Sequence, residues 1–305
     1  MEPRRTPSSP RRPLRARTTP FRQHDVEVGG TRLRYIDVAP TTQDASATPL
    51  LMVHGHSSRI EEYDEVVPHL ARTHRVVVVD LPGCGYSDKP NKPYSLELYE
   101  DVLLGFLDAL HIQEARVAGG SLGGNLTLRL GHRVPDRFPA LAAWAPAGAW
   151  QPMRWIADAG KSVGRMAGGL LFWPFVWVQS RYWYEARFPK RDAMLREVFA
   201  YYREVMGPGF ARMYFEIALD QLKNSHFSYA SSIEQPTLLA YGDRDNGMNM
   251  GEGVKMLARM MPRAELKVFA GARHSLASEI PEQLATACEE FFQRPTPPPR
   301  ITLAA

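Results

Sequence analysis

The sequence has little cysteine and no long apolar run. Its two cysteines, Cys84 and Cys288, are too few for a disulfide framework, a four-cysteine zinc site or an iron–sulfur cluster. Cysteines used this sparingly are typical of a reducing compartment, so we expect a cytoplasmic protein. No stretch reaches the roughly 18 apolar residues that a membrane-spanning helix needs.

The chain also lacks a basic excess outside its first 22 residues. Residues 1–22 contain seven arginines and one acidic residue, whereas the rest of the chain contains 30 basic and 32 acidic residues. The formal net charge of +4 therefore comes from one end of the chain. Because a nucleic-acid-binding domain carries its basic residues on the folded surface, we expect no nucleic-acid partner.

The two ends are poor in apolar residues and rich in proline. Five prolines among the first 20 residues interrupt any helix, so residues 1–23 are predicted to be a disordered tail that folding and catalysis do not need. The arginines also permit an organelle transit peptide or a twin-arginine export signal, although the amphipathic helix and the apolar stretch that these require are missing. Residues 294–305 are predicted to be a second, proline-rich tail.

Between the tails, short apolar runs alternate with segments of helical length and spacing, which is typical of a parallel sheet covered by helices. The expected strands cover 24–28, 32–38, 50–54, 76–80, 115–119, 141–145, 237–241 and 265–269. The expected helices cover 61–72, 96–110, 122–134, 251–261 and 281–293. Residues 146–233 depart from the alternation, with many aromatics and mostly helical periodicity. We interpret them as a helical insertion into a core made of 24–145 and 234–293.

A serine lies at the sharpest expected turn. Residues 119–123 read Gly-Gly-Ser-Leu-Gly between a strand and a helix, and G-x-S-x-G in that context indicates a nucleophile elbow. Small neighbours relieve the strained backbone of such a turn, and the helix N-terminus favours developing negative charge. The alternative is a glycine-rich turn with a serine N-cap. We predict that Ser121 is the nucleophile.

A serine hydroxyl needs a base, and the base needs a third group to hold it. Asp243 and Asp245 follow one expected strand, and His274 follows the next. The order Ser, Asp, His goes with this kind of elbow, and both sites fall at the carboxyl ends of strands, where open sheets bind ligands. His274 is therefore the candidate base, and Asp245 is the better of the two candidate acids.

The segment His54-Gly-His-Ser-Ser58 directly follows a strand and is the candidate oxyanion loop. Attack on a carbonyl creates an oxyanion, which backbone N–H groups stabilise. The N–H groups of Leu122 and His56 are the natural donors. The imidazole of His54 is expected to hold the loop in place rather than to transfer protons.

Taken together, His54-Gly55, Asp80-Leu-Pro-Gly-Cys-Gly-Tyr-Ser87, Gly119-Gly-Ser-Leu-Gly123, Gly242-Asp-Arg-Asp245 and His274 resemble the α/β-hydrolase superfamily. The resemblance covers residues 24–293. It implies a mainly parallel eight-stranded sheet with flanking helices and a helical cap inserted after the sixth strand. It also implies a triad of Ser121, Asp245 and His274, and no cofactor.

The family is chemically broad. Its haloalkane dehalogenases and epoxide hydrolases carry aspartate at the elbow, where this chain has Ser121, so their chemistry is excluded. The resemblance makes hydrolysis of a carboxylic ester through an acyl-enzyme the default reaction, without a metal. Acyl transfer, aminopeptidase activity and a non-catalytic role as a small-molecule receptor stay open as alternatives.

Aromatic residues mark the expected cap and the strand before it. Trp144, Trp150, Phe172 and Trp173 are candidates to contact a small, apolar substrate. The uncharged stretch 166–180 is too short to span a bilayer. Three hypotheses fit this stretch. Its aromatic residues are buried inside the cap, cover the pocket of Ser121, or bind a membrane surface.

Overall fold

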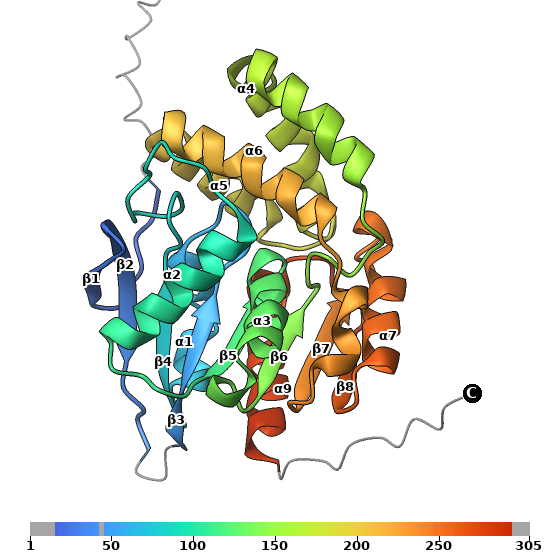
Figure 1. The fold of residues 1–305 in the computed structure, drawn as a ribbon. Coiled ribbons are helices and arrows are strands. Elements are labelled where there is room, and N and C mark those ends of the chain that lie inside the picture. Colours follow the sequence, from blue (N-terminus) through green and yellow to red (C-terminus); the bar gives the residue numbers. More distant parts are fainter. Residues whose placement is uncertain (1–15, 43–45, 295–305) are drawn as a thin grey trace, which may run out of the picture.

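The computed structural model describes residues 16–42 and 46–294. Residues 1–15 and 295–305, which make up most of the two predicted tails, lie outside these ranges. Within the described part, one sheet is flanked by helices, and further helices lie above one end of its strands (Figure 1). This arrangement brings the carboxyl ends of the central strands under a helical layer.

Eight strands form the sheet. They are β1 (Gln23–Val28), β2 (Thr31–Val38), β3 (Ser46–Val53), β4 (His74–Val79), β5 (Arg116–Gly120), β6 (Leu141–Trp144), β7 (Thr237–Gly242) and β8 (Ala264–Phe269). Their order is β1-β2-β4-β3-β5-β6-β7-β8. Strand β2 is antiparallel to both of its neighbours, and the other described pairings are parallel. The predicted mainly parallel, eight-stranded sheet is confirmed.

Helices cover both faces of the sheet. One face packs against α2 (Leu96–Ala109), α3 (Leu122–Arg133) and α7 (Met250–Met260). The other packs against α1 (Val67–Leu70), α8 (Leu276–Glu279) and α9 (Pro281–Gln293). Short 3-10 turns complete the described fold at η1 (Ile60–Tyr63), η2 (Pro135–Arg137), η3 (His226–Ser228), η4 (Ala230–Ser232) and η5 (Gly247–Asn249).

The central strands are apolar on both faces because helices cover both. In β4, Val77 and Val79 face one core, and Val76 and Val78 face the other. All four side chains are fully buried, as expected for a parallel sheet inside an α/β fold. Val53, the last residue of β3, is paired with Val79 of β4 and with Gly119 of β5. These three strands therefore end at about the same level of the sheet, and the loops that follow them lie close together.

The predicted helix over residues 61–72 is wrong. The structure instead has η1 and the short α1, which are separated by three residues. The reason is Pro68, which lies in the first turn of α1. Proline lacks an N–H and blocks the preceding turn, so the helix begins there rather than at 61.

Three helices form the insertion between β6 and β7, which we call the cap. They are α4 (Arg154–Trp183), α5 (Arg191–Val205) and α6 (Pro208–Lys223). They lie above the carboxyl ends of the strands (Figure 1). Inside the cap, Phe172 of α4 contacts Tyr202 of α5 and both Phe210 and Tyr214 of α6. These tilted and edge-on rings give the cap a small core of its own.

Residues 16–22 belong to the fold, which differs from the predicted tail over 1–23. The Ala16 N–H donates to Glu204 and the Arg17 N–H donates to Glu197, both on α5. The Thr19 side chain, 6% exposed, donates to Asp64 at 2.6 Å. Composition could not reveal this, because the segment is held mainly by hydrogen bonds to carboxylates, and only Ala16 and Phe21 add apolar contacts with the core.

A truncation series should separate the two parts of the N-terminal region. Removal of residues 1–15 should leave the catalytic rate and the melting temperature unchanged. Removal of residues 1–22 also deletes four hydrogen bonds to carboxylates, donated by the N–H groups of Ala16, Arg17 and Thr19 and by the Thr19 hydroxyl. Each is worth about 1.5–3 kcal/mol, so the melting temperature should fall by about 5 °C or more. Differential scanning fluorimetry measures both. Equal melting temperatures for the two truncations would show that residues 16–22 do not stabilise the fold.

Candidate active site

Ser121 occupies the turn between β5 and α3 with φ 53° and ψ −115°. Positive φ is unfavourable for a residue with a side chain, so this backbone is strained. Its glycine neighbours permit the turn. A Cβ atom would lie 2.6 Å from the Val53 oxygen at Gly119, and 1.8 Å from that oxygen at Gly123. The hydroxyl therefore stands at the first turn of α3, as expected of an elbow.

The Asp245 carboxylate lies 2.7 Å from Nδ1 of His274. Asp245 follows β7 and is 6% exposed, and His274 follows β8. Asp243 is exposed and accepts instead from the N–H of Gly271. The structure thus brings Asp245, rather than Asp243, to His274.

The environment of His274 favours its protonated form. Burial alone would lower the imidazole pKa, but the charge and hydrogen bond of Asp245, with smaller contributions from Glu62 and Glu279, raise it above its ordinary value of 6.5. The carboxylate also fixes Nδ1 as the donating nitrogen, which leaves Nε2 as the basic one.

The pH–rate profile should report this raised pKa. A general base works only when neutral, so kcat/KM should rise with pH and reach half of its plateau above pH 6.5, the ordinary histidine value. The measurement is kcat/KM for an activated ester between about pH 5 and pH 9. A half-maximum clearly below the ordinary value would contradict the assignment of His274 as base.

Hydrogen bonds within and below it hold the loop after β3, the candidate oxyanion loop. Nε2 of His54 accepts from the Leu81 N–H, so Nδ1 carries the proton and donates to the Gly55 oxygen at 2.8 Å. The Ser58 N–H donates to the same oxygen. Since the N–H of a trans peptide points opposite its carbonyl, these bonds fix the direction of the His56 N–H. His54 has the structural role that the sequence predicted.

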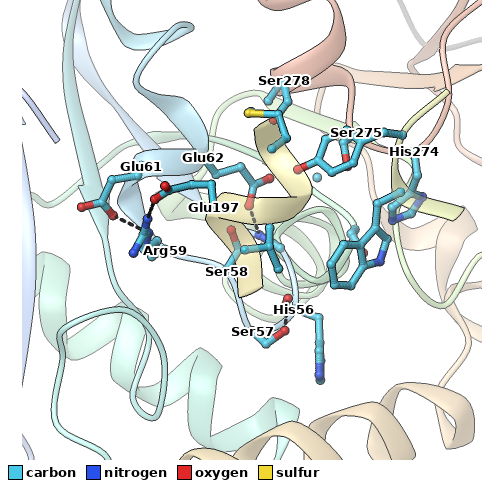
Figure 2. Close-up of a pocket in the computed structure, with 18 of the residues that line it drawn as sticks. His56, Ser57, Ser58, Arg59, Glu61, Glu62, Glu197, His274, Ser275 and Ser278 are labelled. Carbon is cyan, nitrogen blue, oxygen red and sulfur yellow. Dashed lines mark hydrogen bonds and ion pairs between the residues drawn. The ribbon is translucent and has the colours of Figure 1, made fainter. Parts of the chain in front are cut away.

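The His56 imidazole points away from His274 (Figure 2). It is packed edge-on against Tyr214 and lies 3.3 Å from the Gln221 amide of α6. Burial lowers its pKa to about 4, so the ring is neutral. The side chain therefore packs against the cap and away from the catalytic candidates.

A buried ion-pair group supports the oxyanion loop and the elbow. Arg34 of β2 binds Asp80 at 2.6 Å and Glu61 of η1 at 2.9 Å, and all three side chains are at most 4% exposed. The hydroxyl of Tyr63, also in η1, donates to the Val53 oxygen and accepts from the Gly120 N–H. The turn η1 is thus fixed between β2 and the strand ends that precede the site.

Ser121 and His274 line the same pocket, which has a volume of about 190 Å³. The oxyanion loop, η1, the end of β6, the loop after β8 and the cap helices form its walls (Figure 2). Leu122, the second predicted donor, is the first residue of α3, and the first N–H groups of a helix have no intrahelical partner.

Of the four predicted substrate-contacting aromatics, one lines this pocket. Trp144 does, at the end of β6. Phe172 is buried inside the cap, Trp173 is stacked on Phe199, and Trp150 packs against the hydrophobic core. Phe172 and Trp173 of α4 pack against the other cap helices, so their rings do not face the pocket.

The aromatics that do line it from the cap are Trp183, Tyr184, Tyr201 and Tyr202. Charged groups line it as well, namely Arg17, Arg59, Glu61, Glu62 and Glu197. Neither motifs nor periodicity predicted these residues. Glu61 and Glu62 lie in the region predicted to be an ordinary helix. The feature that could have indicated their place in the pocket is their short distance in sequence from the candidate oxyanion loop, which begins seven residues before Glu61.

Among the described residues, no group of three or more His, Cys, Asp and Glu side chains is arranged to hold a metal ion. None of the described helices combines the length and hydropathy of a membrane span.

The α/β hydrolase fold family model matches residues 48–279. Because the match covers well over half of the chain, the chain belongs to the α/β-hydrolase fold family. The resemblance inferred from the motifs is confirmed, and the protein is an enzyme of the α/β-hydrolase class.

Curated relatives share about a quarter of their residues with this chain. A 2-hydroxymuconate semialdehyde hydrolase from Pseudomonas sp. (strain CF600) is 26% identical over 269 residues, which cover 80% of this chain and 86% of that protein. The dihydrolipoyllysine-residue acetyltransferase component of the acetoin cleaving system from Pseudomonas putida is 27% identical over 277 residues, covering 88% of this chain and 68% of that protein.

Solved structures share the fold. A probable hydrolytic enzyme from Pseudomonas aeruginosa PAO1 superposes with a TM-score of 0.76 at 23% identity, covering 91% of this chain and 96% of that one. The enol-lactonase from Burkholderia xenovorans LB400 gives a TM-score of 0.73 at 22% identity, covering 89% and 100%. At these identities the likeness shows the fold alone.

Proposed function

We propose that the protein is a serine hydrolase that cleaves a carboxylic ester of a small substrate through a Ser121–His274–Asp245 triad. One observation carries the proposal: Ser121 at a strained elbow and His274, held by Asp245 at 2.7 Å, line one pocket. A nucleophile, a base and the group that orients the base are the parts that acyl transfer to serine requires.

The reaction follows from these positions. Nε2 of His274 takes the proton of the Ser121 hydroxyl as its oxygen attacks the ester carbonyl. The N–H groups of His56 and Leu122 stabilise the oxyanion. His274 then gives the proton to the leaving alcohol, and an acyl-enzyme forms. Water, deprotonated by the same imidazole, releases the acid and restores Ser121.

An acyl-length series tests the proposed reaction. The protein should hydrolyse p-nitrophenyl esters, and kcat/KM should rise about tenfold from acetate to butyrate, because each buried methylene contributes about 0.8 kcal/mol. The rings of Trp144 and Trp183 in the pocket wall supply the apolar surface. Absence of turnover on every ester would contradict the proposal, and a flat profile would show that the rings do not contact the acyl chain.

A second candidate reaction has a specific basis in the relatives. One of them is named a semialdehyde hydrolase and is matched over most of both chains. The same nucleophile and base could cleave a carbon–carbon bond next to a ketone. Parallel assays with a 2-hydroxy-6-oxo-dienoate and with butyrate esters discriminate the two, because a specialised enzyme should prefer one class by at least about 100-fold in kcat/KM.

A further inference from the structure

Glu62 lies beside the nucleophile and holds the candidate oxyanion loop through one of its two carboxylate oxygens. Its Oε2 accepts from the Gly55 N–H at 2.9 Å (Figure 2). A Cβ atom placed on Gly55 would lie 3.4 Å from that oxygen and 3.7 Å from Cβ of Ser121. The carboxylate and the Ser121 side chain thus flank the same point of the pocket wall.

Among the described residues Glu62 has no arginine or lysine partner, in contrast to the other charges of the pocket, although its charge acts on His274. Arg59 is paired with Glu61 and Glu197, at 3.2 and 2.6 Å, and Arg17 lies 3.8 Å from Asp64. Within the described part of the chain, no basic side chain forms an ion pair with Glu62. Figure 2 shows Glu62 next to, but separate from, the ion pairs of Arg59.

The negative charge reaches several groups around the pocket. Burial raises the pKa of Tyr184 to about 12, and the charge of Glu62 adds to that rise. It contributes in the same direction at Tyr202 and at His274. The three residues come from α5, the loop after α4 and the loop after β8, so Glu62 acts on the walls of one shared space.

Aromatic rings line the same space. Trp144, Trp183, Tyr184 and Tyr202 all belong to the pocket wall. The faces of such rings attract cations, most of all quaternary ammonium groups, and a partly buried carboxylate does so more strongly. An anionic group would meet the unpaired charge of Glu62 instead.

We propose that Glu62 and the surrounding rings form a subsite for a cationic group of the substrate, so that the enzyme prefers esters that carry an ammonium group. The inference rests on the proposed function for its setting and deepens it by naming the substrate class. Oε2 stays on the Gly55 N–H, and the other oxygen, for which the structure has no described hydrogen-bond donor, faces the cation. Glu62 is a specificity residue and takes no part in bond making.

Two esters that differ only in charge test the subsite. The p-nitrophenyl esters of 4-(trimethylammonio)butanoate and 5,5-dimethylhexanoate have the same shape, and mono-p-nitrophenyl adipate supplies an anionic comparison. The ratio of kcat/KM between the first two should be at least about tenfold in favour of the cation. In Glu62→Gln this ratio should fall at least about tenfold. A ratio taken within one protein cancels any loss of activity common to both esters.

Glu65→Gln is the matched control. It changes the net charge equally, but Glu65 pairs with Lys190 outside the pocket, so the ratio should equal that of the wild-type protein. Equal rates on both esters in the wild-type protein would overturn the subsite. So would a preference for the adipate ester, which would show that Arg59 dominates the pocket.

A binding measurement keeps the test independent of turnover. The alcohols 4-(trimethylammonio)butan-1-ol and 5,5-dimethylhexan-1-ol are titrated calorimetrically into the wild-type and Glu62→Gln proteins. The cationic alcohol should bind the wild-type protein at least about tenfold more tightly, and the substitution should abolish the difference. If no ester is hydrolysed while this difference holds, the proposed function fails and the subsite stands. If esters are hydrolysed and the alcohols bind equally or not at all, the subsite fails alone.

Discussion

Replacement of Ser121 by alanine is expected to lower kcat/KM for p-nitrophenyl butyrate by about 10⁵ to 10⁶-fold. The substitution removes the oxygen that attacks the carbonyl, and a water held in its place lacks the alignment that the elbow imposes. Alanine keeps the Cβ atom that causes the strain at φ 53°, so the backbone cost is unchanged and the fold should be retained. The melting temperature should stay within about 2 °C of the wild-type value.

Ser228→Ala is the matched control for the loss of a hydroxyl. Ser228 is exposed on η3, where its hydroxyl donates to the Ser225 oxygen, remote from the pocket lining. Its activity should equal that of the wild-type protein. A Ser121→Ala protein that keeps more than about a hundredth of the activity would refute the nucleophile assignment, because residual binding alone does not supply that much.

Asp245→Asn is expected to cost about 10³ to 10⁴-fold in kcat. Asparagine keeps the shape but can present its NH₂ group to His274, which then holds the wrong tautomer and exposes a protonated nitrogen to Ser121. It also removes the charge that raises the pKa of His274. The variant should therefore show a lower half-maximal pH as well as a lower plateau.

Asp243→Asn is the matched control, because it removes a different carboxylate from the same loop after β7. Asp243 is exposed and binds the Gly271 N–H, which an asparagine oxygen can also accept. Its kcat should stay within about threefold of wild type, in line with ordinary surface substitutions. If Asp243→Asn were the damaging variant and Asp245→Asn the mild one, the orienting acid would have been misassigned.

The sheet and the elbow could be read from the sequence because both depend on local patterns. Short valine-rich runs such as residues 76–79 are buried on both faces, and only strands covered on two sides tolerate that composition. Gly119 and Gly123 are required because a Cβ atom at either position would lie less than 3 Å from the Val53 oxygen. The glycines in the local sequence therefore indicate that β3 approaches the elbow closely.

The walls of the pocket could not be read in the same way. Whether Phe172 faces the pocket or the cap interior depends on how α4 packs on α6, and periodicity marks both faces as apolar. Glu62 comes from a region predicted to be a helix, and Arg17 from a segment predicted to be a tail. Their positions depend on tertiary contacts, of Glu62 with Gly55 and of Arg17 with Asp64, which no local pattern indicates.

The account depends most on Ser121 being the activated nucleophile, and labelling with a fluorophosphonate tests this most directly. The reagent phosphonylates a serine whose proton is removed by a neighbouring base. Peptide mass spectrometry of the labelled wild-type protein should place one phosphonyl group on Ser121, with labelling lost in Ser121→Ala and at least about 100-fold slower in Asp245→Asn. A label on another residue, or equal labelling of the Ser121→Ala protein, would contradict the account.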